Sequence, residues 1–244
     1  MHLGGQRIDL MEHEQVLAAV SDALERRRQP LRVMSANLDH IYRFDGSADL
    51  FETGDGAQWI VLLDGMPLVW ATRARTRQRW EKIAGSDLLP FLLDVCASRG
   101  ASVGFLGGGP DLVERLPAAL RERWPDLRVA GHWTPPRHVL DDPVLSDALA
   151  DEIAAAGVDL LAVGLNKPHQ EHWIARHGAR TGATVTTGFG AAADFLAGVK
   201  QRCPEPLARI GAEWAYRLCK EPRRLARRYL LEGPAALKLL VARR

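Results

Sequence analysis

The sequence contains few cysteines and no arrangement that pairs them. Its three cysteines, Cys96, Cys203 and Cys219, are odd in number, widely spaced and without a CxxC motif. This pattern favours the reduced thiols of a cytosolic protein over a disulfide framework. No apolar run is long enough to span a bilayer, and the N-terminus has no apolar segment typical of a signal peptide. We therefore expect a cytoplasmic protein without a membrane-spanning segment.

Several common catalytic signatures are also missing. The sequence has no Asp-x-Asp, the usual carboxylate pair of a Mg²⁺ or Mn²⁺ diphosphate site, and no GxSxG nucleophile elbow. His169 and His172 stand close together, but His169-Gln-Glu-His172 is not the HExxH motif of zinc proteases. We expect neither a bound metal nor a resident cofactor.

The overall composition is that of a soluble globular protein. Of the 244 residues, 47% are hydrophobic and 25% are charged, and the formal net charge is only +2. This balance gives no reason to expect a nucleic-acid partner. Basic residues instead concentrate near the C-terminus, at Lys220, Arg223, Arg224, Arg227, Arg228, Lys238, Arg243 and Arg244.

Short apolar runs alternate with helical patterns from residue 31 to residue 200. Strands are expected at 31–35, 59–63, 102–106, 127–131, 160–163 and 183–187, with a further short one at 68–71. Helices are expected at 12–27, 88–98, 111–123, 147–156 and 168–180, and an irregular helix and loop at 45–58. This alternation predicts an α/β fold with a Rossmann-like, mainly parallel sheet and helices on both faces.

Beyond Pro204 the pattern is helical only. We expect one helix at 205–220 and a helical tail at 223–244, interrupted at Gly233-Pro234. A basic amphipathic tail favours contact with an anionic membrane surface; the alternative is a packed helix with a solvated basic face. The expected organisation is a core at 1–203 and a basic helical appendage at 204–244.

Polar residues follow the first two core strands at the carboxyl ends, where α/β sheets bind their ligands. Ser35 and Asn37 follow the first strand, and Asp64 follows the second, directly before Gly65. A carboxylate at that position is a candidate general base, although an aspartate before glycine is also a common turn. For Ser35 and Asn37 the alternative role is helix capping.

The stretch 159–171 joins a buried strand to a helix through a polar loop. Gly164, Lys167 and Gln170 lie in this loop, and Pro168 suits the first turn of the helix. A cationic, amide-rich loop at a helix N-terminus suits an anion such as a nucleotide diphosphate. The alternative is an ordinary loop between strand and helix.

Glycines mark two further strand ends. Gly107 and Gly108 close the strand at 102–106, where they let a backbone approach a ligand or simply form a tight turn. The segment 188–193 matches the dinucleotide fingerprint GxGxxA. The fingerprint requires a second strand ending in an acid, and none is expected after it. We therefore interpret Gly190 as a site of close ligand approach or of helix–strand packing.

These motifs, in this order, resemble the WecG/TagA/CpsF family, glycosyltransferase family 26, over nearly the whole chain. The matching segments are 35–37, 63–65, 81–87, 105–108, 159–164, 168–171, 188–198, 202–204, 213–224 and 227–229. The resemblance implies a Rossmann-like fold of the GT-E type whose C-terminal appendage helps to close the site.

The resemblance also implies an activity. Members are inverting, metal-independent transferases that move a sugar, often N-acetylmannosamine or a related hexose, from a UDP-sugar to a polyprenyl-diphosphate-linked acceptor. They work peripherally on the inner face of the cell membrane in cell-surface polysaccharide biosynthesis. The alternatives are a nucleotide-sugar-binding protein of this fold without transferase activity, and a dehydrogenase on the GxGxxA match. The oligomeric state stays open, with a homo-oligomer among the alternatives.

Residue roles follow from the resemblance, motif by motif. Asp64 resembles the catalytic base, and Ser35 lies near the base and the acceptor. Asn37 and Gln170 resemble residues around the sugar and nucleotide, and Asp194 resembles the residue at the uracil end.

The resemblance also implies which residues balance the negative charge of the leaving group. Arg217, Arg224 and Arg227 resemble appendage arginines that neutralise the diphosphate, as a reaction without a metal requires. Lys82 stands where the family usually has arginine, and Cys203 replaces the usual alanine. These departures leave the donor and the acceptor open.

Overall fold

The computed structural model describes residues 1–27, 29–44, 54–209 and 211–242. The expected irregular helix and loop at 45–58 lies mostly outside these residues. Its described part, 54–57, contains bends and no helix, and residue 58 already belongs to a strand.

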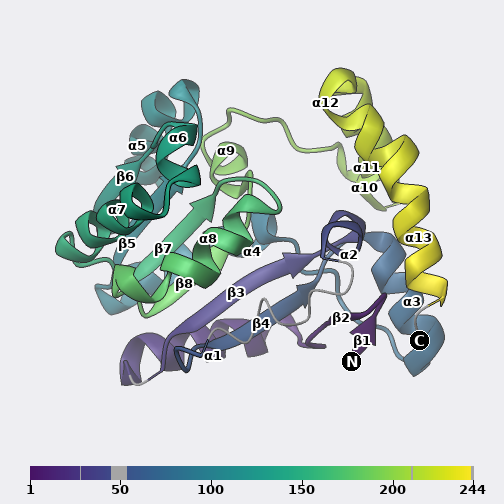
Figure 1. Ribbon diagram of the computed structural model, residues 1–244, viewed down its shortest axis with the longest axis horizontal. Helices are drawn as coiled ribbons and strands as arrows, with labels where there is room; N and C mark the ends of the chain where they lie inside the picture. Colours follow the sequence, from purple (N-terminus) through teal and green to yellow (C-terminus); the bar gives the residue numbers. More distant parts are fainter. Residues whose placement is uncertain (28, 45–53, 210, 243–244) are drawn as a thin grey trace.

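Six strands form one parallel sheet in the order β4-β3-β8-β7-β5-β6, as Figure 1 shows. Their bounds are β3 Leu31–Ala36, β4 Gln58–Leu63, β5 Ser102–Gly107, β6 Arg128–Trp133, β7 Leu160–Gly164 and β8 Val185–Gly188. Each lies where a core strand was expected, and the α/β prediction is confirmed. A separate two-stranded hairpin at the N-terminus pairs β1 (His2–Leu3) with β2 (Gln6–Arg7).

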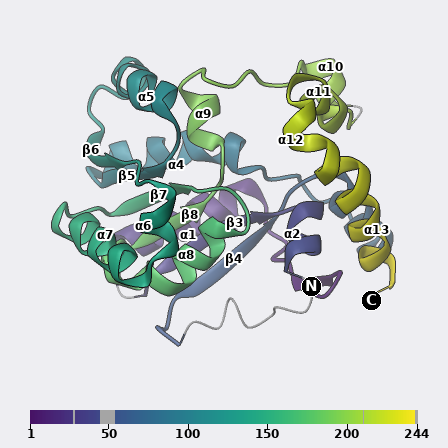
Figure 2. The same cartoon turned by 45° about the horizontal axis from the view of Figure 1, so that its top comes forward.

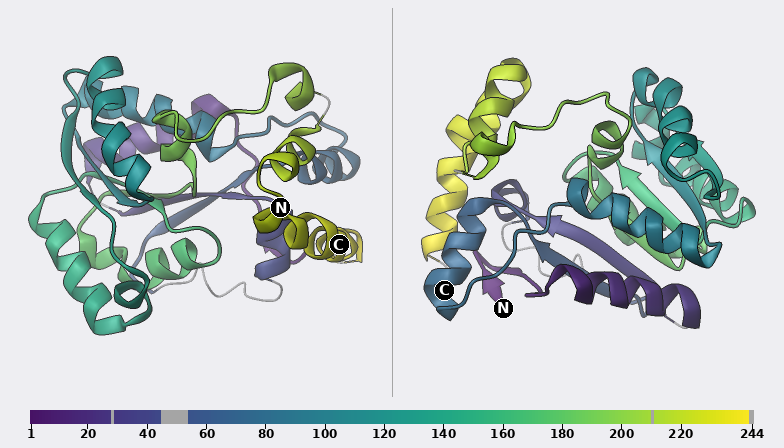
Figure 3. Two further views of the ribbon diagram at one scale, coloured as in Figure 1. Left: turned by 90° about the horizontal axis from the view of Figure 1, so that it is seen from above. Right: turned by 180° about the vertical axis from the view of Figure 1, so that it is seen from behind.

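Helices cover both faces of the sheet, as Figure 3 shows. The helices up to the end of the sheet are α1 His13–Arg26, α2 Leu38–Arg43, α3 Met66–Thr76, α4 Gly85–Arg99, α5 Pro110–Arg123, α6 Arg137–Asp141, α7 Pro143–Ala155, α8 His169–His177 and α9 Ala192–Leu196. The described residues form two apolar cores, one on each face of the sheet. Successive residues of a strand point to opposite faces, so Val33 packs with α1, α4 and α5, while Met34 packs with α7 and α8.

One expected strand is a helix instead. The apolar run 68–71 lies inside α3, which begins just after Gly65 and has Pro67 in its first turn. Leu68 and Thr72 are both fully buried and stand four residues apart, which is the spacing of one helical face. A short apolar run is compatible with the two-residue period of a strand and with the 3.6-residue period of a helix, and here tertiary packing selects the helix. The helix expected at 88–98 also begins earlier, at Gly85, with Ala84 at the N-cap position.

The C-terminal helices differ from the prediction in two places. The expected helix at 205–220 is divided into α10 (Glu205–Arg209) and α11 (Glu213–Lys220), and Gly211 between them has a φ of +76°. The tail, expected to break at Gly233-Pro234, continues through them. It consists of α12 (Pro222–Arg227), a π-helical turn (Arg228–Glu232) and α13 (Gly233–Ala242). The wider π turn ends two residues before Pro234, which has no N–H to donate to a regular α-helical turn.

The C-terminal helices stand beyond the carboxyl ends of β3 and β4, beside α3 (Figures 1 and 2). A long extended segment connects them to α9 (Figure 1). Among the described residues, no helix has both the length and the apolar character needed to cross a membrane.

The strand order places two candidate binding points at this edge of the sheet. β3 lies beside β8, and β5 lies beside β7, although each pair is distant in sequence. From such neighbours the connecting segments leave in opposite directions, and α/β sheets bind ligands in the crevice that this creates. The remaining question is which side chains reach each crevice.

Candidate active site

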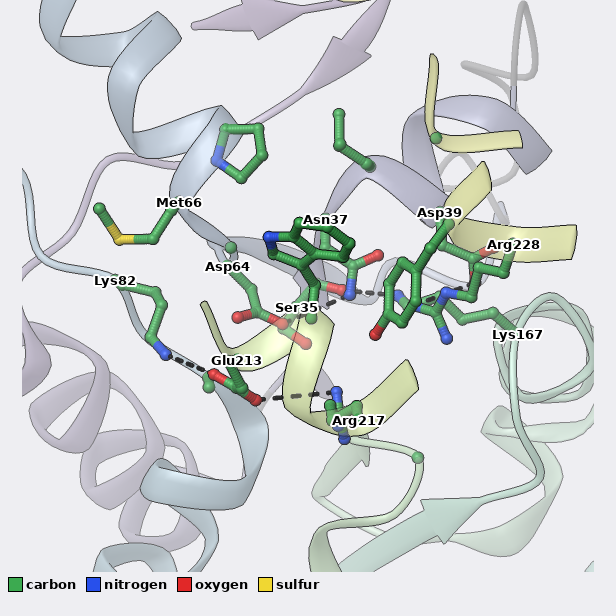
Figure 4. Close-up of a pocket in the computed structure, with 18 of the residues that line it drawn as sticks. Ser35, Asn37, Asp39, Asp64, Met66, Lys82, Lys167, Glu213, Arg217 and Arg228 are labelled. Carbon is green, nitrogen blue, oxygen red and sulfur yellow. Dashed lines mark hydrogen bonds and ion pairs between the residues drawn. The ribbon is translucent and has the colours of Figure 1, made fainter. Parts of the chain in front are cut away.

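A cavity of about 1250 Å³ lies between the carboxyl ends of β3, β4 and β8 and the C-terminal helices. Figure 4 shows its charged and polar residues converging from both sides. Its main polar lining consists of Ser35, Asn37, Asp39, Asp64, Lys82, Lys167, Gln170, Glu213, Arg217 and Arg228. The first five of these come from segments that follow β3 and β4, so the polar residues at those two strand ends do meet.

Asp64 stands at the point where β4 leaves the sheet. Its N–H donates to the Ala36 carbonyl at 2.9 Å, which continues the pairing of β3 with β4. Its half-buried carboxylate faces the cavity and accepts a hydrogen bond from Asn37 at 3.5 Å. Burial raises the pKa of the Asp64 carboxyl and Glu213 raises it further, while Lys82, Lys167 and the Asn37 hydrogen bond oppose the rise. A raised pKa makes this carboxylate a stronger base.

Asn37 combines the two roles that its position predicted. It is the N-cap of α2, where its side-chain oxygen accepts from the His40 N–H at 3.3 Å. Its side-chain nitrogen donates to Asp64. One amide therefore starts a helix and orients the carboxylate. Ser35 lies beside it at the end of β3, 6% exposed, and lines the same cavity.

An ion triad joins the strand ends to the C-terminal helices. The Lys82 ammonium lies 3.3 Å from one oxygen of Glu213, and the Arg217 guanidinium lies 3.8 Å from the other. Burial lowers the pKa of Lys82, but Glu213, Asp64 and Asp87 together raise it more, so the net shift is upward. Lys82 therefore stays cationic. The triad gives the cavity two cations suited to an anionic ligand, with Glu213 as the acid that the ligand would have to displace.

The loop between β7 and α8 is held by its own polar contacts. The Lys167 ammonium donates to the Ser35 carbonyl at 2.6 Å and to Glu171 at 2.9 Å. Gln170 is 1% exposed; its nitrogen donates to the Gly188 carbonyl at 2.9 Å, and its oxygen accepts from the Gly190 N–H at 3.0 Å. Gln170 thus fixes the β8–α9 loop against the cavity. α8 begins at His169, one residue after Pro168.

Four of the predicted site residues lie in a second, much smaller crevice. Gly107, Gly108, Gly164 and Asp194 line a space of about 20 Å³ at the ends of β5 and β7, and Gly190 lines both spaces. A Cβ at Gly107 would lie 2.6 Å from the Gly164 carbonyl oxygen, and one at Gly164 would lie 2.6 Å from the Gly190 carbonyl oxygen. Gly107 and Gly164 therefore let three loops pack backbone to backbone. Asp194 pairs with Lys200 at 3.6 Å.

The three predicted arginines are placed differently from one another. Arg217 lines the cavity, and its guanidinium lies 5.4 Å from the centre of the Phe195 ring. Arg227 has a side chain that is 80% exposed, pairs with Glu232 at 3.2 Å and does not line the cavity. Arg224 belongs to α12, and its side chain lies outside the described part of the chain.

Sequence reasoning did not select Arg228 and Glu213, which are among the charged residues that line the cavity. Arg228 lines it and lies 3.5 Å from Asp39, whereas the prediction selected its neighbour Arg227. Successive residues of a helix point in different directions, so only the packing of α12 decides which arginine faces inward. Glu213 was also missed, although it opens the motif at 213–224. It does not follow a strand, and nothing local in the sequence brings it to Asp64.

No three His, Cys, Asp or Glu side chains among the described residues are grouped so that they could hold a metal ion. The sheet has no strand after β8 in the described part of the chain. The GxGxxA segment therefore lacks the strand that a dinucleotide fingerprint requires, as the sequence indicated.

The structure is a parallel α/β sheet with a polar cavity at the carboxyl ends of its strands, the place where such sheets bind their ligands. Residues 1–244 match the glycosyl transferase WecG/TagA/CpsF family, and the chain belongs to this family. The resemblance drawn from the motifs is confirmed.

Two relatives are transferases with the same name. The chain is 28% identical over 181 residues to the N-acetylglucosaminyldiphosphoundecaprenol N-acetyl-beta-D-mannosaminyltransferase of Bacillus subtilis (strain 168). The matched stretch covers 73% of this chain and 67% of the relative. It is 28% identical over 169 residues to the enzyme of that name from Bacillus spizizenii (strain ATCC 23059 / NRRL B-14472 / W23), covering 68% of this chain and 63% of the relative. The matched stretch thus spans about two thirds of each relative.

Proposed function

We propose that this protein is an inverting, metal-independent glycosyltransferase that moves a sugar from a UDP-sugar to a polyprenyl-diphosphate-linked acceptor in cell-surface polysaccharide biosynthesis. The observation that carries the proposal is one cavity in which a base of raised pKa, Asp64, lies near the cations Lys82 and Arg217. The names of the two relatives support N-acetylmannosamine or a related hexose as the sugar and a GlcNAc-diphosphate lipid as the acceptor.

The proposed reaction is a single displacement. Asp64 removes the proton of the acceptor hydroxyl, and the hydroxyl oxygen attacks the anomeric carbon of the donor sugar. The bond from that carbon to the diphosphate breaks, and its electron pair goes to the phosphate oxygen of departing UDP. Lys82 and Arg217 meet the charge that develops there. Attack from the side opposite the leaving group inverts the anomeric centre.

Donor binding can be tested by calorimetry in the presence of EDTA, with UDP, ADP and NAD as ligands. We expect binding that is selective for UDP and unchanged by EDTA, because the charge partners are side chains of the protein. A UDP affinity that EDTA abolishes would contradict metal independence. UDP binding without transfer to any lipid-linked acceptor would support the alternative, a nucleotide-sugar-binding protein. NAD binding would favour the dehydrogenase alternative.

We further propose peripheral attachment to the cytoplasmic face of the membrane through the C-terminal helices. Leu230 and Leu231 are 58% and 69% exposed, and neither lines the cavity. Arg227 at the end of α12 and Lys238 in α13 are exposed as well. An apolar surface flanked by cations is typical of contact with anionic lipid.

Vesicle co-sedimentation tests this attachment. We expect binding to vesicles that contain anionic phospholipid and weaker binding to zwitterionic vesicles, since each basic residue contributes about 1 kcal/mol near an anionic surface. The double change Leu230→Ser and Leu231→Ser should abolish most of the binding. Val144→Ser is a matched control, because Val144 is 76% exposed on α7 and far from these helices in sequence. Vesicle binding that survives deletion of residues 204–244 would rule out this surface.

A further inference from the structure

The cavity has an apolar extension that the transfer chemistry does not use. One wall is α3, which begins two residues after Asp64. Its lining residues are Met66, Pro67, Trp70, Ala71, Ala74 and Arg75. These stand at the spacing of a single helical face, so the face of α3 lines the cavity along most of its length. From Met66 to Ala74 this face extends for about 12 Å at the rise of an α-helix.

The opposite wall is the facing side of α13. Pro234, Leu237, Leu240 and Val241 line the cavity from this helix, and α3 and α13 lie side by side in Figure 1. Arg75 marks the far end, where it donates to the Leu240 carbonyl at 2.7 Å and to the His2 carbonyl at 3.0 Å. We name the space between the two helices the α3–α13 groove.

The groove leaves large apolar surface open to water. Trp70 is 56% exposed, Leu237 is 43% exposed and Val241 is 76% exposed. Ala71 and Ala74 on the α3 wall are small, so the groove has room as well as apolar walls. Apolar surface of this kind, rimmed by polar residues, marks a binding site.

The charge at its inner end indicates the occupant. Where the groove meets the polar half of the cavity it reaches Arg228, which lies 3.5 Å from Asp39 and is separate from the pair Lys82 and Arg217 assigned to the donor diphosphate. A ligand that fills both parts therefore has an anionic head and an apolar chain. Trp214 and Tyr229 line the cavity too, with ring centres 6.2 Å apart, and the Arg228 guanidinium lies 5.8 Å from the centre of the Tyr229 ring.

We propose that the α3–α13 groove binds the first isoprene units of the acceptor's polyprenyl chain, with the diphosphate toward Arg228. The proposal rests on the proposed function for the identity of the acceptor. It assigns the acceptor lipid to the α3 side of Asp64, and thus leaves the β8 side of the cavity to the donor nucleotide.

Calorimetry with prenylated diphosphates tests the groove separately from catalysis. The probes are farnesyl diphosphate, geranyl diphosphate and inorganic diphosphate, each titrated into the intact protein without detergent. We expect affinity to rise with chain length, so that farnesyl diphosphate binds at least about tenfold more tightly than inorganic diphosphate. Ala71→Phe should reduce the affinity for farnesyl diphosphate to that for inorganic diphosphate, because the ring fills the groove.

The controls separate the possible results. Ala118→Phe adds the same ring to an exposed position of α5 and should change nothing; UDP affinity checks that Ala71→Phe is folded. Equal affinity for all three probes in the unmodified protein would overturn the groove assignment, and a simultaneous change in the oligomeric state of Ala71→Phe would assign the groove to a second copy of the chain. Chain-length-dependent binding without sugar transfer would keep the groove and remove the proposed function. Sugar transfer by a protein whose affinity does not depend on chain length would support the proposed function and remove the groove assignment.

Discussion

Replacing Asp64 by asparagine is expected to lower kcat by about 10²–10⁴-fold, which is the usual contribution of a general base. The substitution keeps the size of the side chain and the backbone hydrogen bond from residue 64 to Ala36. UDP affinity should change little, because the cations Lys82 and Arg217 stay in place. Steady-state kinetics with a lipid-linked acceptor and calorimetry with UDP measure the two effects.

The pH dependence of the unmodified enzyme provides a second check on Asp64. Its pKa is raised above the ordinary aspartate value of 3.8 by burial first and by Glu213 in addition. Below that raised pKa the carboxyl is protonated and cannot accept a proton, so kcat/KM should fall as the pH decreases through it. Above it the carboxylate is ionised and the rate should level off. The Asp64→Asn variant should lose this acidic limb.

A matched control is Asp126→Asn, which removes the same charge from an exposed position. It should leave kcat unchanged. If Asp64→Asn retains full turnover, Asp64 is not the base; if it unfolds while Asp126→Asn does not, Asp64 is a structural turn residue.

The strands of this protein are predictable because a buried parallel strand is a short apolar run. The run 59–63 gives β4 and the run 160–163 gives most of β7. The run 68–71 has the same composition, yet it lies in a helix, because Pro67 fits a first helical turn and Leu68 and Thr72 pack on one helical face. A short apolar segment does not by itself distinguish a strand from a helix, and tertiary packing selects between them.

The same limit applies to the site. Ser35, Asn37 and Asp64 follow neighbouring strands, so their meeting could be predicted from a parallel sheet alone. Gly107 and Gly164 end β5 and β7, which lie two or more positions away from β3 in the sheet. They therefore form a separate crevice. Strand order depends on how the helices pack, which local sequence patterns do not encode. Glu213 and Arg228 reach this cavity only because the C-terminal helices stand over this edge of the sheet.

Arg217→Ala should have the second largest effect, a loss of about 10²–10³-fold in kcat, the usual cost of removing a donor from a developing oxyanion. Of the predicted appendage arginines whose side chains the structure describes, Arg217 lines the cavity, where it shares Glu213 with Lys82. UDP affinity should weaken as well, because the ground-state diphosphate already carries negative charge. Arg217→Lys should recover only part of the loss, since an ammonium cannot form the paired contacts of a guanidinium.

Arg227→Ala is the matched comparison, because family resemblance assigns Arg227 the same role while its side chain is 80% exposed and paired with Glu232. With a water-soluble acceptor, which removes any membrane effect, Arg227→Ala should retain nearly full kcat. Equal losses in the two variants would mean that the C-terminal helices rearrange when substrate binds.

Glu213→Gln is expected to change UDP affinity in the opposite direction to Arg217→Ala. It frees Lys82 and Arg217 from a competing carboxylate, so UDP should bind more tightly if the diphosphate takes the place of Glu213. Weaker UDP binding would instead show that Glu213 holds the two cations in position.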